Sequence, residues 1–190
     1  RDKMFRALEE IQNAGVTWVG IETDAGQGTK IHDKQVASDC APLSLQELKD
    51  IRKNVSCPLI CKGILSRRDA EKCVEAGADG MVISNHGAHT LDYLPHALQV
   101  MDEIVEAVGD KIVLIADGGF RRGSDVLKGL AFGASIVGLG RPILYGLAAG
   151  GREGVYQLID EITKEMIRIM SMIGAENPTK VTRAMLIEDP

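Results

Sequence analysis

The segment Met81-Val82-Ile83-Ser84-Asn85-His86-Gly87 decides the fold, because an apolar run typical of a strand ends there in a polar turn that carries a histidine. The same design recurs in Ile112–Gly123 and in Ile136–Pro142, where glycine and arginine follow the apolar run. Parallel α/β sheets build their ligand sites at the C-terminal ends of buried strands. Three such strand ends predict a phosphate-binding site beside a group that can transfer protons.

The composition is that of a folded globular protein. Of the 190 residues, 45% are hydrophobic and 26% are charged, which argues against intrinsic disorder. The net charge of −5 argues against a nucleic-acid partner. No apolar run approaches the ~18 residues that a membrane span needs, and the N-terminus lacks a signal-peptide core. We therefore expect a cytoplasmic protein without a membrane partner and, because it begins with Arg1, a piece of a longer chain.

The cysteines point to no metal or redox motif. Cys40, Cys57, Cys61 and Cys73 include no CxxC pair. We expect reduced and mostly buried thiols, as is usual in a cytosolic protein.

Helices and strands alternate along the chain. Glycine after three of the amphipathic segments (Gly15, Gly77 and Gly133) and serine before several of them predict helices at about 3–14, 44–54, 67–76, 95–108, 124–132 and 152–173. Apolar runs predict strands at about 17–22, 58–62, 80–84, 112–116 and 135–139.

The alternation predicts a parallel sheet, and the nearly continuous apolar runs predict strands covered on both faces. An open doubly wound sheet and a closed barrel share this pattern. We favour the barrel because polar residues follow every strand instead of clustering at one switch point. Five strands correspond to the C-terminal five-eighths of a (βα)8 TIM barrel, so we interpret residues 1–190 as part of one domain whose first three strands are absent.

Two of the strand ends are suited to binding an anion. Asp117-Gly118-Gly119-Phe120-Arg121-Arg122-Gly123 follows a strand and opens a helix, so backbone N–H groups and Arg121 or Arg122 can approach a phosphate. Gly140-Arg141 follows the last strand in the same way. Each segment alone could be a tight turn with a solvated arginine. Two of them at neighbouring strand ends favour phosphate.

The other strand ends carry acid–base groups. Lys62 ends its strand in the turn Lys62-Gly63-Ile64, where an ammonium can stabilise negative charge on a ligand. His86 and Asp24 both lie at strand C-termini, so the carboxylate can orient the imidazole as a general base. A lone histidine is more often structural. Metal binding by His86-x-x-His89 is not favoured, because no helix carries the pair and no acidic third ligand is evident.

Taken together, these motifs resemble the FMN-dependent 2-hydroxy-acid oxidase and dehydrogenase family, which includes glycolate oxidase, lactate oxidase and flavocytochrome b2. The resemblance covers about Pro58 to Gly174. It rests on Lys62-Gly63, Ser84-Asn85-His86-Gly87, Leu91-Asp92, the Asp117–Asp125 segment and Gly140-Arg141-Pro142.

The resemblance implies an FMN site at the mouth of the barrel and assigns a role to each motif. Lys62 would stabilise the reduced flavin ring, and Ser84 would touch the flavin or its ribityl chain. His86, supported by Asp24, would take the hydroxyl proton of the substrate while the α-hydrogen passes to flavin N5. The ribityl and phosphate would be held by the residues of the two glycine-rich turns: Asp117, Gly118, Gly119, Phe120, Arg121, Gly140 and Arg141.

Three positions depart from the family pattern. His89, followed by Thr90, stands where the family has an arginine that grips the substrate carboxylate, and Lys30 takes the place of a second arginine. Glu22 falls where the family has a threonine that touches the flavin. We still expect His86, His89 and Lys30 to contact the substrate. Because an arginine clamp is missing, that substrate is expected to be larger or less anionic than lactate or glycolate.

These observations predict an FMN-dependent oxidoreductase that oxidises a 2-hydroxy acid or related hydroxy compound, and by resemblance a homotetramer. Two alternatives remain open at this point. One is a non-oxidising FMN barrel such as isopentenyl diphosphate isomerase, which has less need of the His86 base. The other is a non-catalytic fragment that keeps the fold, with or without affinity for phosphate, but catalyses no reaction.

Overall fold

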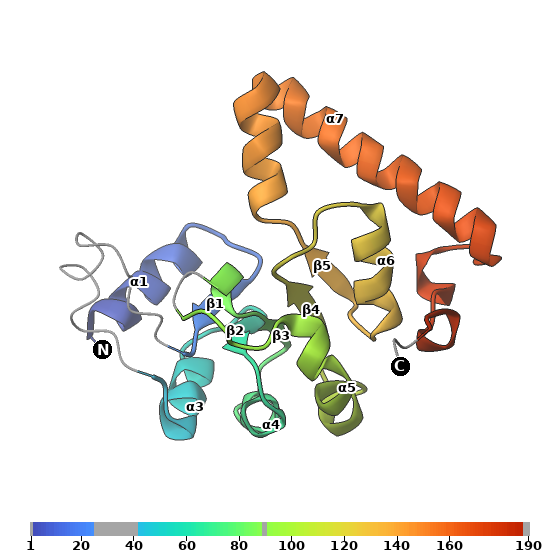
Figure 1. Ribbon diagram of the computed structural model, residues 1–190. Coiled ribbons are helices and arrows are strands. Elements are labelled where there is room, and N and C mark those ends of the chain that lie inside the picture. Colours follow the sequence, from blue (N-terminus) through green and yellow to red (C-terminus); the bar gives the residue numbers. More distant parts are fainter. Residues whose placement is uncertain (1, 25–41, 89–90, 188–190) are drawn as a thin grey trace. The chain divides into compact units, whose positions relative to one another are not determined.

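The computed structural model describes residues 2–24, 42–88 and 91–187 (Figure 1). Contacts divide the chain into two compact units, Arg1–Leu114 and Ile115–Pro190. The boundary falls inside strand β4 (Val113–Asp117). None of the helices in these described ranges is long and apolar enough to cross a membrane.

The first unit alternates strands and helices, as the sequence predicts. Its elements are α1 (Asp2–Asn13), β1 (Val19–Glu22), α3 (Leu45–Lys53), β2 (Leu59–Ile64), α4 (Arg67–Glu75), β3 (Gly80–Ile83), the 3-10 turn η1 (His86–Ala88) and α5 (Ala97–Val108). β1 pairs with β2 and β2 with β3, both in parallel. Parallel pairing brings the C-terminal ends of all three strands to one edge, where the acid–base residues were predicted.

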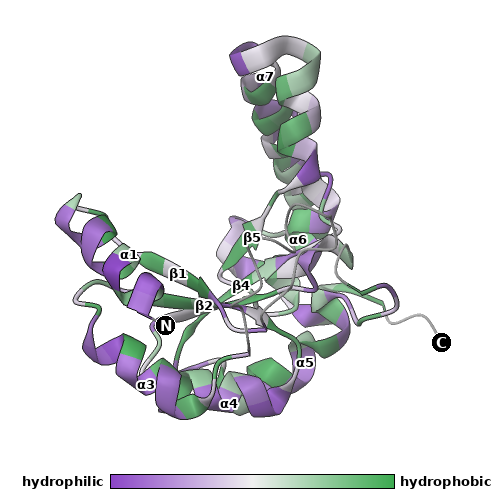
Figure 2. Cartoon of the chain, turned by 90° about the vertical axis from the view of Figure 1, so that its left-hand side faces the viewer, coloured by the Kyte–Doolittle hydropathy of each residue, from purple (hydrophilic) through white to green (hydrophobic). Residues whose placement is uncertain are grey.

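The helices of the first unit form where their caps and apolar faces indicate. Ser44 and Ser66 accept hydrogen bonds from the N–H groups of Glu47 and Asp69, so both serines act as the predicted N-caps. In Figure 2, α3, α4 and α5 carry hydrophilic and hydrophobic residues in turn along their length. Their apolar sides pack on the strands in a core of fully buried side chains that includes Ile51, Leu59, Ile64, Met81, Ile83, Met101 and Ile104.

Strand β2 is longer than predicted. The sequence suggested that it ends at Lys62, whereas the structure continues it to Ile64. The register against β3 shifts between Lys62 and Ile64, and Gly63 has φ +96°. A glycine in this conformation allows a β-bulge, in which β2 and β3 stay paired on either side while one extra residue of β2 is left out of the pairing.

The second unit contains the end of β4, α6 (Gly123–Ala131), β5 (Ile136–Gly138), α7 (Arg141–Ile173) and the 3-10 turns η2 (Pro178–Lys180) and η3 (Arg183–Met185). β4 pairs in parallel with β5, so that Asp117 lies opposite Gly138 at the C-terminal ends. The helix expected from Ser124 begins one residue earlier, with Arg122 as its N-cap.

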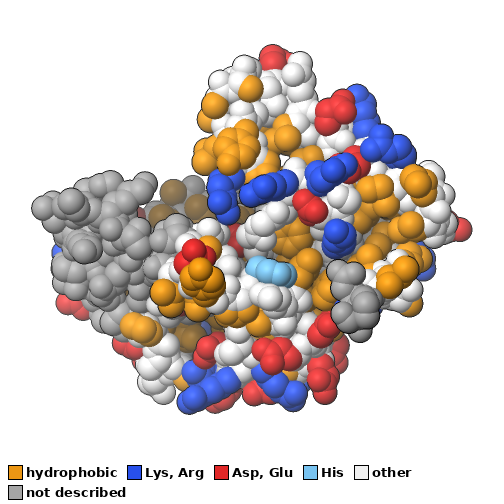
Figure 3. Space-filling model, viewed as in Figure 1, with side chains coloured by type: hydrophobic (Ala, Val, Ile, Leu, Met, Phe, Trp, Pro, Cys, Tyr) orange, Lys and Arg blue, Asp and Glu red, His pale blue; other side chains and the backbone are white. Residues whose placement is uncertain are grey.

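Helix α7 differs most from the sequence expectation. It begins at Arg141 rather than near 152, because Pro142 fits the first turn of a helix. Non-helical angles at Gly150 and Gly151 divide it into two segments. Exposed hydrophobic side chains, orange in Figure 3, gather over the first segment and include Leu144, Tyr145 and Leu147. On the second segment Ile162 and Met170 are buried, whereas Ile159 is exposed.

The covering of the strands is also uneven. β2 and β3 are largely buried, but Val113 in β4 and Ile136 in β5 are 44% and 52% exposed. Hydropathy predicted all five strands to be covered on both faces, and within this chain β2 and β3 are the strands largely covered in this way.

The two segments of α7 touch at Gly146 and Gly154. A Cβ at Gly154 would overlap the carbonyl oxygen of Gly146. We expect Gly154→Ala to lower the free energy of unfolding by about 1–3 kcal/mol, because backbone atoms have to move apart. Gly150→Ala is the control, since a Cβ there meets nothing within 4 Å. Denaturant unfolding followed by circular dichroism measures both variants, and equal stability of the two would contradict the close contact.

Candidate active site

The turn after β3 presents His86 in a fixed orientation. His86, Gly87 and Ala88 have φ of 56°, 68° and 61°, a left-handed run that is costly outside glycine. Ser84 is fully buried, and its hydroxyl accepts the N–H of His86 at 3.1 Å. Asn85 Oδ1 accepts the N–H groups of Gly87 and Ala88 at 3.0 and 3.2 Å. The buried polar side chains therefore hold a strained turn, as is common at functional sites.

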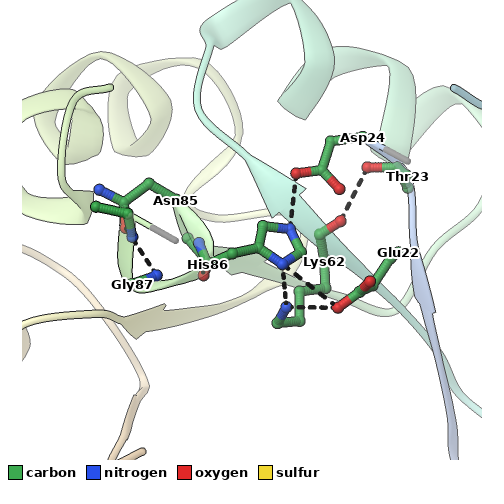
Figure 4. Close-up of polar contacts among 9 residues, drawn as sticks. Glu22, Thr23, Asp24, Lys62, Asn85, His86 and Gly87 are labelled. Carbon is green, nitrogen blue, oxygen red and sulfur yellow. Dashed lines mark hydrogen bonds and ion pairs between the residues drawn. The ribbon is translucent and has the colours of Figure 1, made fainter. Parts of the chain in front are cut away.

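His86 lies between charged groups from β1 and β2 (Figure 4). Its Nε2 is 2.7 Å from Oδ2 of Asp24, which follows β1. On the other side of the ring, Nδ1 is 3.1 Å from Nζ of Lys62. The histidine side chain is only 6% exposed. The structure thus brings together the three residues that the sequence placed at neighbouring strand ends.

The contact with Lys62 indicates which tautomer of His86 fits this arrangement. The Lys62 ammonium is a donor only, so Nδ1 has to accept. The neutral ring then carries its proton on Nε2, facing the Asp24 carboxylate. The nitrogen opposite Asp24 holds the lone pair that can take a proton.

Gly63 provides the space for Asp24. A Cβ at Gly63 would lie 2.5 to 2.8 Å from the three carboxyl atoms of Asp24. Thr23 fixes the same stretch, because its N–H and its hydroxyl both donate to the Lys62 carbonyl oxygen, at 2.9 and 3.0 Å. The bulge in β2 and the end of β1 together hold the Asp24 carboxylate against His86.

In the second unit, the end of β4 carries a side-chain oxygen that accepts no hydrogen bond from the described residues. Asp117 Oδ1 is buried and has no hydrogen-bond partner among the described residues. Gly118 and Gly119 follow with φ of +91° and +89°. The space beside Gly119 and Gly140 is open, since a Cβ at either would meet nothing within 4 Å. A buried carboxylate oxygen beside two exposed backbone turns suits a ligand with hydroxyl groups.

The two arginines after β4 have different roles. The Arg122 guanidinium binds Glu165 of α7, at 2.7 Å from Nε and 2.6 Å from Nη2. This hydrogen bond lowers the pKa of the Glu165 carboxyl and raises the pKa of Arg122. The Arg121 guanidinium is exposed and has no such partner within the described ranges. Of the two candidates from the sequence, Arg121 is the one available to an anion.

Of the remaining predicted site residues, two lie within the described part of the chain. Arg141 is exposed at the start of α7. Phe120 is buried, with its ring against the site of Gly129, so it can offer a ligand little beyond its backbone. His89 and Lys30, predicted to contact the substrate, lie outside the described residues, as does Cys40.

The described cysteines are not part of this site. Cys61 and Cys73 are buried in β2 and α4, and Cys57 is half-buried. The hydrogen bond that the Cys73 thiol donates to Cys61, together with burial, raises the pKa of Cys73 well above its usual range. Within the ranges that the structure describes, no three His, Cys, Asp or Glu side chains are grouped as metal ligands.

Sequence reasoning missed the parts of the site that depend on pairing. Glu22 was noted only as a departure from a pattern, yet its carboxylate contacts Lys62 and lies near His86. The role of Gly63 as the space for Asp24 was also missed. A parallel alignment of the two predicted strands would have placed Glu22 beside Lys62.

The family of the chain is established by comparison with known proteins. The model of the FMN-dependent dehydrogenase family matches residues 3–188. The chain belongs to this family. Membership agrees with the motif resemblance and with the geometry of His86, Asp24 and Lys62.

Relatives in the FMN-dependent dehydrogenase family are oxidases of 2-hydroxy acids. A peroxisomal (S)-2-hydroxyacid oxidase of Arabidopsis thaliana is 43% identical over 165 residues, which cover 87% of this chain and 46% of that protein. The 4-hydroxymandelate oxidase of Amycolatopsis orientalis is 38% identical over 184 residues, covering 92% of this chain and 52% of that protein. The chain thus spans about half the length of the curated relatives that it matches.

The family fold is confirmed by solved structures. Mandelate oxidase with benzoylformic acid matches with a TM-score of 0.85 and 31% identity, over 96% of this chain and 58% of that one. Since mandelate oxidase is a TIM-barrel enzyme, the prediction of parallel barrel strands is confirmed.

Proposed function

We propose that the complete protein is an FMN-dependent oxidoreductase that converts a 2-hydroxy acid, or a related hydroxy compound, into the oxo product. The observation that carries the proposal is His86, held between Asp24 and Lys62 on neighbouring strand ends, in a chain of the FMN-dependent dehydrogenase family. This arrangement supplies a base, its carboxylate partner and a cation at one site.

The residues present are suited to FMN. In the second unit, the partnerless Asp117 Oδ1 can accept a ribityl hydroxyl, and the open backbone at Gly119 and Gly140 allows close approach of the chain to a ligand. Arg121 and Arg141 would bind the phosphate. In the first unit, Lys62 would face the ring. When bound, FMN would supply the acceptor for the α-hydrogen of the substrate and its electron pair.

His86 would remove the hydroxyl proton of the substrate. The hydroxyl would bond to the ring nitrogen opposite Asp24, in place of the Lys62 N–H that occupies it in the structure. After transfer, both ring nitrogens carry protons and the imidazolium is stabilised by Asp24 at 2.7 Å. The substrate loses this proton and its α-hydrogen with two electrons, which leaves a C=O bond.

The identity of the substrate depends on two of the three departures from the family pattern, His89 and Lys30. Without the arginine pair, His89 and Lys30 would meet the acid group, and neither offers a planar two-pronged cation. We propose a 2-hydroxy acid or hydroxy compound larger or less anionic than lactate or glycolate. We also propose a homotetramer and a cytoplasmic location, although relatives such as the Arabidopsis oxidase are named as peroxisomal.

The first test is the visible absorption spectrum of the complete protein, followed by anaerobic addition of a panel of 2-hydroxy acids. A flavin spectrum that bleaches with one of them supports the proposal and identifies the substrate class. A bound flavin that bleaches with none favours a non-oxidising reaction such as isomerisation. A protein without flavin would overturn the proposal.

FMN affinity distinguishes the roles of the arginines. We expect Arg121→Ala and Arg141→Ala each to raise the Kd for FMN in the complete protein by about 10- to 100-fold. Each substitution removes a charge-assisted hydrogen bond to the phosphate, and the loss of such a bond weakens binding by about this factor. Arg122→Ala is the matched control, because its guanidinium binds Glu165 instead. Fluorescence quenching of FMN titrated into apoprotein measures all three. Unchanged affinity in both Arg121→Ala and Arg141→Ala would refute the assignment.

A further inference from the structure

Glu22 is a second carboxylate of the His86 site. The register of β1 and β2 places Glu22 directly beside Lys62. Its Oε1 lies 2.7 Å from Nζ of Lys62 and 3.5 Å from Nδ1 of His86 (Figure 4). Asp24 lies on the opposite side of the ring, so His86 has one carboxylate near each nitrogen.

The Lys62 ammonium is held by two acceptors at once. One N–H is directed at Glu22 and another at Nδ1 of His86, at 2.7 and 3.1 Å. A lysine bound by a single acceptor on a flexible four-carbon stem samples many positions, whereas two acceptors define its place. The same carboxylate offsets the positive charge of Lys62.

We propose that Glu22 is a positioning residue, which keeps Lys62 against the proton-accepting nitrogen of His86 and sets the charge that this corner of the site presents to FMN. The inference rests on the proposed function and extends it. Once a substrate proton is on Nδ1, Glu22 is the carboxylate on that side of the imidazolium. It also limits how much positive charge Lys62 offers to a reduced, anionic ring.

A surface ion pair is the alternative role for Glu22. Its side chain is 53% exposed, and exposed pairs contribute little to stability. A pair of that kind would affect neither the flavin nor the state of His86. The chain offers a matched control in Lys49 and Glu75, also 2.7 Å apart, on α3 and at the end of α4.

The first readout is the midpoint potential of bound FMN, measured by equilibration with reference dyes in complete Glu22→Gln and Glu75→Gln proteins. We expect Glu22→Gln to favour the reduced flavin by about tenfold, a positive shift of about 30 mV for a two-electron couple. Glu75→Gln should leave the potential unchanged. Glu22→Asp, which keeps the charge on a shorter stem, should restore most of the wild-type value.

The second readout is independent of the flavin. In apoprotein labelled with ¹⁵N-histidine, the His86 signals, assigned with His86→Gln, report which ring nitrogen is protonated. We expect one tautomer, protonated on Nε2, in the wild type and in Glu75→Gln, and a mixture in Glu22→Gln.

The two readouts separate the inference from the proposed function. If neither the potential nor the tautomer changes in Glu22→Gln, the inference is wrong. If the protein binds no FMN, the proposed function fails, and the tautomer alone decides whether Glu22 positions His86. A changed tautomer with an unchanged potential would overturn the part of the inference that concerns the flavin.

Discussion

Replacement of His86 by glutamine is expected to lower kcat for the preferred hydroxy acid by about 10²- to 10⁴-fold, the usual contribution of a positioned general base. Glutamine can keep polar contacts with Asp24 and Lys62 but cannot take up the substrate proton. Anaerobic stopped-flow measurement of flavin reduction isolates this step from reoxidation. The flavin content of the variant should equal that of the wild type, since His86 is assigned no part in binding the phosphate or ribityl.

His96→Gln is the control for that experiment. His96 is exposed and stands at the N-cap of α5, and it has no assigned role in the site. Its replacement should leave flavin reduction unchanged. Rapid reduction in His86→Gln, at the wild-type rate, would show that another group takes the proton.

Much of the fold could be predicted from local signals. Ser44 and Ser66 are N-caps because their hydroxyls satisfy N–H groups within the next turn, which needs no distant partner. The element boundaries that were predicted wrongly depend on tertiary contacts. β2 extends past Lys62 because β3 continues to pair with it across a bulge, and nothing local in Lys62-Gly63-Ile64 distinguishes a bulge from a turn.

In the candidate site, too, local signals predict some residues and tertiary contacts decide others. Lys62, Asp24 and His86 could be predicted because each follows an apolar run, and parallel strands end at one edge. The choice between Arg121 and Arg122 could not be predicted. It depends on Glu165, which is 43 residues from Arg122 in sequence and comes close only when α7 packs on α6. Pairings between distant segments decide which of two equivalent side chains remains available to a ligand.

Gly63 connects the fold to the chemistry, since the bulge that lengthens β2 also leaves room for the Asp24 carboxylate. Gly63→Ala is therefore expected to lower kcat by about 10- to 100-fold, because a displacement of about 1 Å in an active site can cost that much. The added Cβ would lie 2.5 Å from Asp24 Cγ. The carboxylate is the movable partner, and in moving it leaves His86.

Strain at Gly63 has to be separated from the collision with Asp24, because alanine is unfavourable at φ +96° wherever it occurs. Gly15→Ala supplies the comparison: φ there is +80°, and a Cβ would meet nothing within 4 Å. Both variants should lose a similar amount of stability in thermal unfolding, and only Gly63→Ala should lose activity. Equal activity in the two would contradict the role given to Gly63.

A double-mutant cycle tests whether Gly63 acts through Asp24. If the Cβ acts by displacing the carboxylate from His86, Asp24→Asn already removes what Gly63→Ala disturbs. The two substitutions should then be far from additive, as expected for residues in direct contact. We expect kcat of the double variant to be close to that of Asp24→Asn alone. Additive losses would mean that the alanine disturbs β2 itself, and through it Lys62, rather than the contact between Asp24 and His86.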